Sequence, residues 1–338
     1  MRAIQIGVEK FGTAWRKGIT DISNLEVAGI VDINTTNLEK AREFYGLSES
    51  VCYEDPYGNW VEQLDADFII DSTPHHFHYR NAIKAMRNGL DVIVVKPMSD
   101  NFDEAQMIVD EAERLGRKLV VAQQLRYHPP CLKLKEFIEK GMIGDIVYGN
   151  LEVFFGEDGG VRDKWYQPYP IVVEISVHHF DLLRWITGLE PVTVVSELWN
   201  MPWNDKAWGK KNVGSIFKMN NDARFSFRAI STRDEGESYP GHWTIEGTKG
   251  ILKYKDQQIF LNGEKIWPEG DEVYSDLSLE NYNKEVLKRT IEYFKGGNEI
   301  SITGKDNLNT LAMVYGSIES SNHGKKINIA NGVIKYDN

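Results

Sequence analysis

The sequence predicts an α/β protein in which a doubly wound parallel sheet is followed by a second, α+β domain. Short runs rich in Val and Ile alternate with segments of helical periodicity over residues 1–122, as expected of strands that crossover helices bury on both faces. Beyond residue 123 strands follow strands, which is typical of an antiparallel or mixed sheet. Because a chain of 338 residues is longer than a domain with one hydrophobic core usually is, we expect two domains, 1–122 and 123–338.

Five strands are predicted in the first domain, with helices between them. The strands cover residues 4–7, 26–32, 66–71, 91–95 and 118–122. Apolar residues then repeat at helical spacing in two segments that stop at Gly46 and Gly89, since glycine commonly ends helices. A third helix runs to about Leu115, and Asn101 and Glu104 stand three apart at its start as a cap.

The second domain begins near Gln123–Pro130, where the chain leaves the last parallel strand and meets two consecutive prolines. Its predicted helices cover about 131–140, 174–187, 279–294 and 307–320. Its predicted strands cover about 146–155, 215–219, 224–230, 243–246 and 250–254. Successive strands without intervening helices favour an antiparallel or mixed sheet.

Composition restricts the class of partner. The formal charge of -11 is spread without any long block of one sign, so we expect neither a nucleic-acid nor a membrane partner, and a small molecule fits better. Cys52 and Cys131 lie far apart, which argues against a disulfide framework or a thiolate metal site and suits a reducing compartment. The chain runs from Met1 straight into a strand and has no long apolar run, so we expect a cytoplasmic protein.

The first strand leads into a partial dinucleotide fingerprint. Gly7-Val8-Glu9-Lys10-Phe11-Gly12 has the first and third glycines of G-x-G-x-x-G, the signature of a Rossmann domain, but carries Glu9 at the second. A middle glycine lets the backbone approach a pyrophosphate, whereas the Glu9 carboxylate would repel it by roughly 1 kcal/mol at about 4 Å in a water-like dielectric. The alternative interpretation is that both glycines merely form a turn.

Asp32 supports the dinucleotide interpretation. It ends the second strand 25 residues after Gly7 and can accept hydrogen bonds from ribose hydroxyls. Neither Ile33 nor Asn34 is basic, so a 2′-phosphate would meet a carboxylate and no cation, which favours NAD over NADP. Asp32 could instead be a simple helix cap.

Five further blocks carry a resemblance to one family. They are Asp71-Ser72-Thr73-Pro74-His75-His76-Phe77-His78, Val94-Val95-Lys96-Pro97, Gln124-Leu125-Arg126-Tyr127, Glu174-Ile175-Ser176-Val177-His178-His179-Phe180-Asp181 and Ile245-Glu246-Gly247-Thr248-Lys249-Gly250. They resemble segments of the Gfo/Idh/MocA family, which includes glucose-fructose oxidoreductase and inositol dehydrogenase. In the same order, those segments are the T-P-x-x-x-H turn, the E-K-P segment, the start of the second domain, the D-x-G-x-H-x-x-D helix and a late turn of the sheet. Val95, Glu174 and Ser176 depart from that pattern.

The resemblance implies a Rossmann domain, a second domain with a large, mostly antiparallel open-faced sheet, and a homo-oligomer, dimer or tetramer. It places catalytic residues at Lys96 and His178, with the acid Glu174 one turn earlier. The implied cofactor-binding residues are Gly7, Glu9, Phe11, Gly12, Asp32, Ile33, Thr73, Pro74, His78 and Lys96, with His78 near the nicotinamide. The implied substrate-binding residues are Lys96, Gln124, Arg126, Trp165, Tyr166, Glu174 and His178.

The residues also support acid–base chemistry without the family. On one helix, Glu174, His178 and Asp181 would share a face, and an acid that orients an imidazole suits removal of a proton from a hydroxyl. His75 and His179 lie close in sequence to other histidines, but His75 follows a strand end and His179 is expected to point away from His178, so we expect no metal site.

The leading hypothesis is an NAD-dependent dehydrogenase that transfers hydride between nicotinamide and a secondary alcohol of a sugar, inositol or related polyol. One alternative is an epimerase or glycoside-cleaving enzyme that uses NAD for transient oxidation. Another is a non-catalytic regulatory protein that binds a dinucleotide or a sugar. The departures at Glu9 and Val95 favour this alternative, whereas the presence of Lys96 and His178 argues against it.

Overall fold

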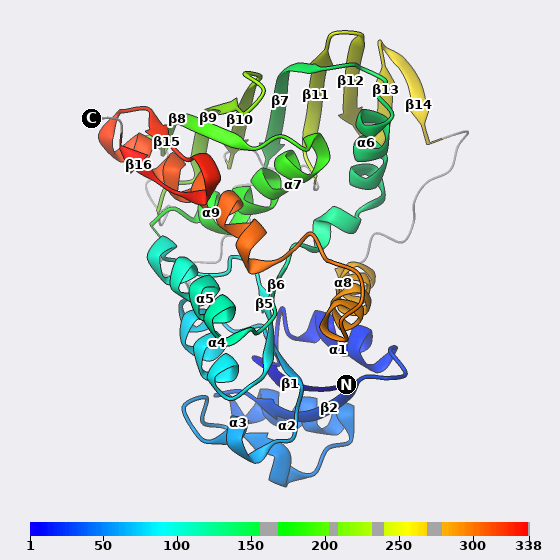
Figure 1. Cartoon of the computed structure of the whole chain (residues 1–338), viewed down its shortest axis with the longest axis vertical. Coiled ribbons are helices and arrows are strands. Elements are labelled where there is room, and N and C mark those ends of the chain that lie inside the picture. Colours follow the sequence, from blue (N-terminus) through cyan, green and yellow to red (C-terminus); the bar gives the residue numbers. More distant parts are fainter. Residues whose placement is uncertain (156–167, 203–208, 232–239, 269–278, 337–338) are drawn as a thin grey trace. The chain divides into compact units, whose positions relative to one another are not determined.

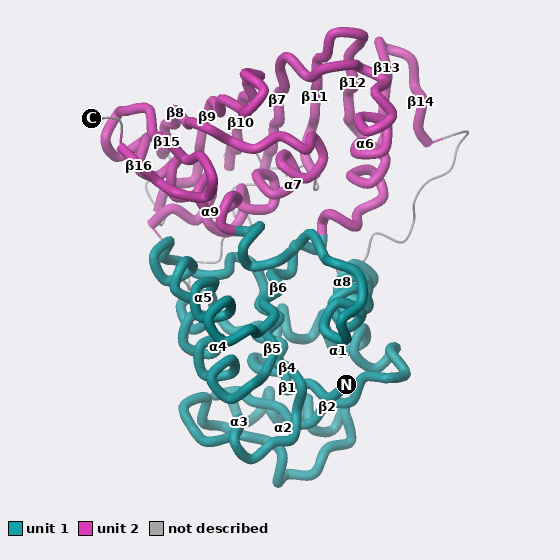
Figure 2. The backbone as a smooth tube through the Cα atoms, viewed as in Figure 1, with its two compact units in different colours: residues 1–124, 276–307 teal, residues 125–275, 308–338 magenta. Residues whose placement is uncertain are grey.

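The protein was analysed as a computed structural model, which describes residues 1–155, 168–202, 209–231, 240–268 and 279–336. The chain forms two compact units (Figure 2). Unit 1 contains residues 1–124 and 276–307, and unit 2 contains residues 125–275 and 308–338. The first boundary lies two residues beyond the expected one, and the return of 276–307 to unit 1 was not expected from the sequence.

Unit 1 contains the predicted parallel sheet (Figure 1). Its strands are β1 Arg2–Ile6, β2 Glu26–Val31, β3 Cys52–Tyr53, β4 Phe68–Asp71, β5 Asp91–Val95 and β6 Leu119–Ala122, in the order β3-β2-β1-β4-β5-β6. Every pair is parallel, and β4 and β6 are buried along their whole length, which confirms the doubly wound fold. The order reverses between β1 and β4, the point at which such sheets bind ligands.

Helices cover both faces of this sheet. They are α1 Thr13–Thr20, α2 Thr35–Tyr45, α3 Trp60–Gln63, α4 His78–Arg87, α5 Phe102–Leu115 and α8 Leu279–Phe294. The predicted cap at Asn101 is confirmed, because its side chain accepts a hydrogen bond from the Glu104 amide. The predicted stop at Gly46 is confirmed as well, since this residue ends α2 with a φ of 66°.

The return of the chain to unit 1 results from packing of α8 on α1. The Asn283 side chain donates to the carbonyl oxygen of Ala14, and Lys284 forms an ion pair with Asp21 at 2.7 Å. A Cβ at Gly18 would lie 3.3 Å from the Lys284 Cα, so glycine allows the two helices to approach closely. The sequence predicted the bounds of α8 but assigned it to the second domain, because local periodicity does not identify the surface on which a helix packs.

Unit 2 is built on a ten-stranded sheet. Its strands are β7 Ile146–Phe154, β8 Pro191–Trp199, β9 Asn212–Met219, β10 Arg224–Ile230, β11 His242–Gly247, β12 Gly250–Lys255, β13 Gln258–Leu261, β14 Glu264–Trp267, β15 Ile327–Asn328 and β16 Lys335–Tyr336. The order is β14-β13-β12-β11-β7-β10-β9-β8-β15-β16, and the β7–β10 pair is parallel while the other recorded pairings are antiparallel. The mostly antiparallel sheet is thus confirmed.

One face of this sheet carries helices (Figure 1). They are α6 Pro129–Glu139, a π-helix Ile171–Ser176 that continues into α7 Val177–Thr187, and α9 Gly304–His323. Phe180 of α7 packs edge-on against Phe217 and Phe227, with ring centroids 5.0 and 4.8 Å apart. Within the described ranges, none of the helices has the length and apolar character needed to cross a bilayer.

Candidate functional site

The glycine turn after β1 is closely packed. Gly7 has a φ of 73°, and a Cβ there would lie 2.8 Å from the amide nitrogen of Thr73. A Cβ at Gly12 would lie 2.1 Å from the carbonyl oxygen of Gly7, so neither position has room for a side chain. The turn therefore lies against the end of β4, at the switch point of the sheet.

Asp32 ties this turn to the end of β2. One carboxylate oxygen accepts a hydrogen bond from the Val8 amide and the other accepts one from the Asn34 amide, both at 2.9 Å. The side chain is half-buried, and a carboxylate has about four acceptor positions, so capacity for ribose hydroxyls remains. The turn and Asp32 together fit a dinucleotide.

Glu9, which replaces the second glycine of the fingerprint, lies near a positively charged side chain that we did not predict from the sequence. Arg16, on the first turns of α1, donates to the carbonyl oxygen of Val8 and lies 4.0 Å from the Glu9 carboxylate. Its side chain is 10 % exposed, against 39 % for Glu9. Since opposite charges at this distance attract, Arg16 offsets part of the repulsion that Glu9 would exert on a diphosphate. An arginine one helical turn after Gly12 was the available sequence signal.

Two apolar side chains are exposed beside these polar groups. Phe11 in the glycine turn is 59 % exposed, and Ile33 directly after Asp32 is 73 % exposed. Exposed large apolar groups next to a ligand site are candidates to contact a ring system. Both were predicted to bind the cofactor.

Thr73 and Pro74 follow β4 and are held by a small polar network. The amide and the hydroxyl of Thr73 both donate to Asp71, at 3.0 and 2.6 Å, and Asn81 donates to the second oxygen of the same carboxylate at 2.9 Å. Asp71 is fully buried, so this network fixes the loop next to Gly7. Asp71 and Asn81 were not among the predicted site residues.

His78 links two loops at the carboxyl edge of the sheet. It is fully buried, its Nε2 lies 2.8 Å from the carbonyl oxygen of Thr73, and its Nδ1 lies 3.0 Å from the carbonyl oxygen of Pro97. Because the ring is buried between two carbonyl oxygens, its contacts indicate a positioning role, and its place near the nicotinamide stays a prediction. His78 connects the end of β4 to the Lys96–Pro97 segment that follows β5, where Lys96 is half-buried.

His75 adds a neutral imidazole to this edge. Burial lowers the pKa of His75 to about 3, and the charges of His78, His76 and Lys96 act in the same direction. Its Nε2 lies 3.9 Å from Asp100. His75 was not among the predicted site residues, and among the described residues no group of His, Cys, Asp and Glu side chains is arranged to hold a metal ion.

In unit 2, Glu174 and His178 lie on either side of the junction between the π-helix and α7. The sequence predicted one α-helix here, but the turn is widened, and the Ser176 hydroxyl donates to the carbonyl oxygen of Ile171 at 2.7 Å. Glu174 is the one half-buried residue of this six-residue segment, and His178 is 6 % exposed. Such π turns occur frequently at functional sites.

Asp181, three residues after His178 on α7, is buried and paired with an arginine from another segment. It is 1 % exposed and accepts two hydrogen bonds from Arg126, from Nε at 2.7 Å and from Nη2 at 2.6 Å. Arg126 is 2 % exposed, and its guanidinium balances a buried carboxylate; its contact with substrate stays a prediction. His179 is fully buried, and its Nδ1 lies 3.1 Å from the carbonyl oxygen of Ile175.

Of the remaining predicted substrate-binding residues, the structure describes only Gln124. Gln124 is half-buried at the start of a short helical turn, Gln124–Tyr127. Trp165 and Tyr166 lie outside the described residues. The structure thus groups Gly7, Gly12, Asp32, Thr73 and Lys96 at the carboxyl edge of one sheet in unit 1, and places Glu174 and His178 on one helix in unit 2.

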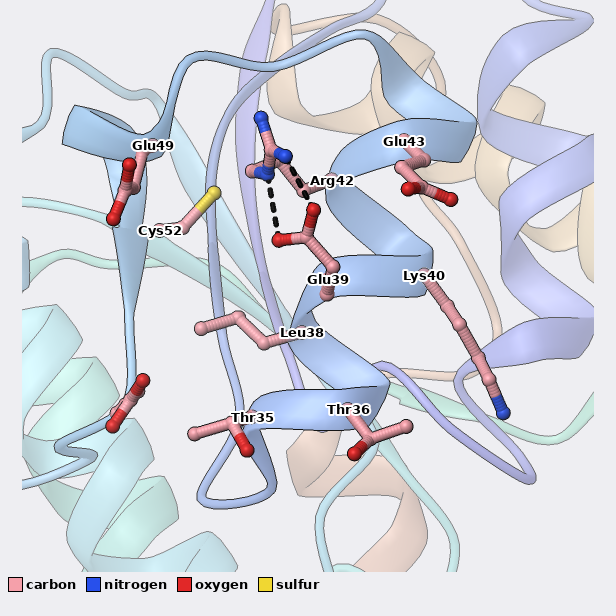
Figure 3. A pocket seen from close by; sticks show the side chains of 10 residues that line it. Thr35, Thr36, Leu38, Glu39, Lys40, Arg42, Glu43, Glu49 and Cys52 are labelled. Carbon is pink, nitrogen blue, oxygen red and sulfur yellow. Dashed lines mark hydrogen bonds and ion pairs between the residues drawn. The ribbon is translucent and has the colours of Figure 1, made fainter.

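A surface pocket elsewhere in unit 1 is distinct from these residues. Figure 3 shows it between α2 and the edge strand β3, where Glu39 pairs with Arg42 and where Glu49 and Cys52 line the side across from α2. Four glutamates line it, which disfavours a diphosphate, and none of the predicted site residues contributes to it.

Comparison with protein families matches both parts of the chain. Residues 1–123 match the Gfo/Idh/MocA model described as an oxidoreductase family with an NAD-binding Rossmann fold. Residues 135–329 match the C-terminal alpha/beta domain of the same oxidoreductase family. The two matches together cover most of the chain.

Three relatives match this chain at low identity but over more than nine tenths of both chains. The chain is 23% identical to a D-apiose dehydrogenase of Rhizobium rhizogenes, over 94% of this chain and 92% of that protein. It is 22% identical to a myo-inositol 2-dehydrogenase of Thermotoga maritima, over 97% and 98%. An oxidoreductase from Agrobacterium radiobacter, crystallised with NAD+, L-tartaric acid and magnesium, superposes with a TM-score of 0.84 at 21% identity, over 98% and 99%. This chain therefore belongs to the Gfo/Idh/MocA oxidoreductase family, with its NAD-binding Rossmann fold and C-terminal alpha/beta domain.

Proposed function

We propose that this protein is an NAD-dependent dehydrogenase acting on a secondary alcohol of a sugar, inositol or related polyol. The observation that carries the proposal is the position of Lys96 directly after β5, at the carboxyl edge of a sheet whose switch point carries the glycine turn. The relatives named as D-apiose and myo-inositol dehydrogenases support this substrate class.

In this proposal NAD is held by unit 1. Gly7 and Gly12 let the backbone approach the diphosphate, and Asp32 accepts hydrogen bonds from a ribose. Phe11 and Ile33 offer apolar surface, and Thr73 and Pro74 form the neighbouring loop. When bound, NAD takes up or releases the hydride.

The chain's own residues move the proton. His178 removes the proton from the substrate hydroxyl, because an imidazole titrates near neutral pH. Lys96 donates a hydrogen bond to the same oxygen, and Glu174 orients the imidazole or binds a neighbouring hydroxyl. Gln124, Trp165 and Tyr166 complete the proposed substrate contacts, while His78 holds the Lys96 segment in place.

A screen of sugars and polyols with NAD and with NADP tests this function. We expect NADH to accumulate with at least one polyol and with NAD in preference to NADP. Product formation without net NADH would instead identify an enzyme that oxidises its substrate transiently. Binding of NAD and sugar without turnover would identify a regulatory protein.

We further propose that two copies of unit 2 associate through the sheet face opposite the helices. Val195 and Ile216 are direct cross-strand neighbours on β8 and β9, and they are 51 % and 54 % exposed. Adjacent exposed apolar residues on a sheet face favour a protein interface. Light scattering should report a dimer or tetramer for the wild type and a monomer, or a smaller oligomer, for a Val195→Glu/Ile216→Glu variant.

We also propose a cytoplasmic location. Cys52 and Cys131 are both free thiols, and burial raises the pKa of each, so neither is poised for disulfide chemistry. Cell fractionation with a tagged chain tests this proposal, and recovery outside the cytoplasm would overturn it.

A further inference from the structure

The glycine turn after β1 is held by side chains of three elements. Gln5 of β1 is fully buried, and its side-chain amide donates to the carbonyl oxygen of Gly12 at 2.8 Å. The hydroxyl of Tyr45, on α2, donates to the side-chain oxygen of Gln5, also at 2.8 Å. Arg16, on α1, donates to the carbonyl oxygen of Val8. Two carbonyl groups of the turn are therefore satisfied from within unit 1.

The amide groups of the turn divide into two sets. The Val8 amide donates to Asp32, and the Gly12 amide donates to the carbonyl oxygen of Glu9, both at 2.9 Å. Within the part of the chain that the structure describes, the amides of Glu9 and Phe11 have no acceptor. Such amides before a helix attract an anion, so they are the donors that the turn offers to a diphosphate. Glu9 thus carries a negative charge on the same stretch of backbone.

The Arg16 guanidinium is paired less completely than those of two other buried arginines. Arg126 and Arg184 each donate two hydrogen bonds to one carboxylate. Arg16 approaches the Glu9 carboxylate only to 4.0 Å, and its Nε is buried without an acceptor among the described residues. Because the Arg16 side chain is 10 % exposed, solvent screens its charge less than that of a surface arginine. Its positive charge therefore acts on negative charge at the turn.

We propose that Arg16 sets the affinity of this turn for the diphosphate of NAD and compensates for the missing middle glycine of the fingerprint. Its buried charge offsets the Glu9 carboxylate, and its hydrogen bond to the Val8 carbonyl holds the turn. Lys10, the neighbouring cation of the turn, is exposed, so solvent screens its charge more strongly. Arg16 is thus a positioning residue that acts through Glu9 and the backbone. This inference rests on the proposed function, since it requires that unit 1 holds NAD.

Titration with NADH, followed by its fluorescence and without any substrate, tests the proposal. Arg16→Met should weaken NADH binding about five- to tenfold, because the Glu9 carboxylate loses its counter-charge. Glu9→Gln should strengthen binding, and Glu9→Gln/Arg16→Met should recover most of the loss, because the charge is balanced again. Arg16→Lys, which keeps the charge, should stay close to the wild type. Arg42→Met is the matched control, because Arg42 also pairs with a glutamate, Glu39, but lies on α2 outside the turn, and it should bind NADH like the wild type.

Ionic strength separates an effect of charge from a change in the shape of the turn. Because salt screens charges, the difference in NADH affinity between Arg16→Met and the wild type should narrow from about 0.05 to about 0.5 M NaCl. Three results would overturn the proposal: unchanged affinity in Arg16→Met, a folded double variant that binds no better than Arg16→Met, and a difference that salt does not alter. If Arg16→Met does not fold, Glu9→Gln alone decides, since no gain in affinity would refute the proposal.

The assay for NADH formation separates this inference from the proposed function. Failure of the charge pattern in a protein that binds and reduces NAD would refute the inference alone. The full pattern in a protein that oxidises no sugar or polyol would refute only the dehydrogenase.

Discussion

Replacement of Asp181 by Asn distinguishes a structural carboxylate from a catalytic one. The carboxylate is 1 % exposed and accepts hydrogen bonds from Arg126 at 2.6 and 2.7 Å, with the Thr310 hydroxyl 3.3 Å away. Asn keeps the shape of the side chain but removes the carboxylate charge that faces the buried Arg126 guanidinium. Breaking such a pair costs about 3–5 kcal/mol. For a unit of this size that corresponds to a fall in the melting temperature of about 6–20 °C.

The assay is thermal unfolding followed by tryptophan fluorescence, with NADH formation measured well below the transition. We expect Asp181→Asn to be much less stable while its folded fraction retains activity. An Arg126→Met/Asp181→Leu variant should recover most of the stability, because an apolar pair removes both buried charges together. Glu136→Gln, which breaks two surface pairs, with Lys133 and Lys140, is the control and should unfold nearly like the wild type. A stable but inactive Asp181→Asn protein would refute this reasoning.

Three further predictions concern the site. His178→Ala should still bind NAD but lose about 10²–10⁴-fold in turnover, since the general base is removed; unchanged activity would contradict the assignment. Asp32→Ala should bind NAD more weakly and discriminate less against NADP, which titration with both cofactors measures directly. Because the pKa of His75 is lowered to about 3, the unfolded chain takes up a proton that the folded chain does not, so stability should fall as the pH drops from about 6.5 towards 3. His75→Gln should flatten that part of the stability profile, and an unaltered profile would exclude the effect.

Much of unit 1 followed from local sequence patterns. Runs of Val and Ile separated by helical periodicity predicted the parallel sheet, and Asn101 and Gly46 marked helix ends because capping depends on residues only a few positions apart. The sequence also located the glycine turn, where Gly7 and Gly12 are required by contacts of the turn with its surroundings.

Contacts between distant segments were decided by the tertiary structure alone. An i, i+3 spacing predicted that Asp181 shares a helix face with His178, yet Asp181 pairs with Arg126, 55 residues away, because a buried carboxylate requires a cation. His78 likewise binds the carbonyl oxygen of Pro97, 19 residues later, and α8 returns to pack on α1. Local periodicity shows which residues become helix or strand, whereas the partner of each buried polar group depends on how the whole chain packs.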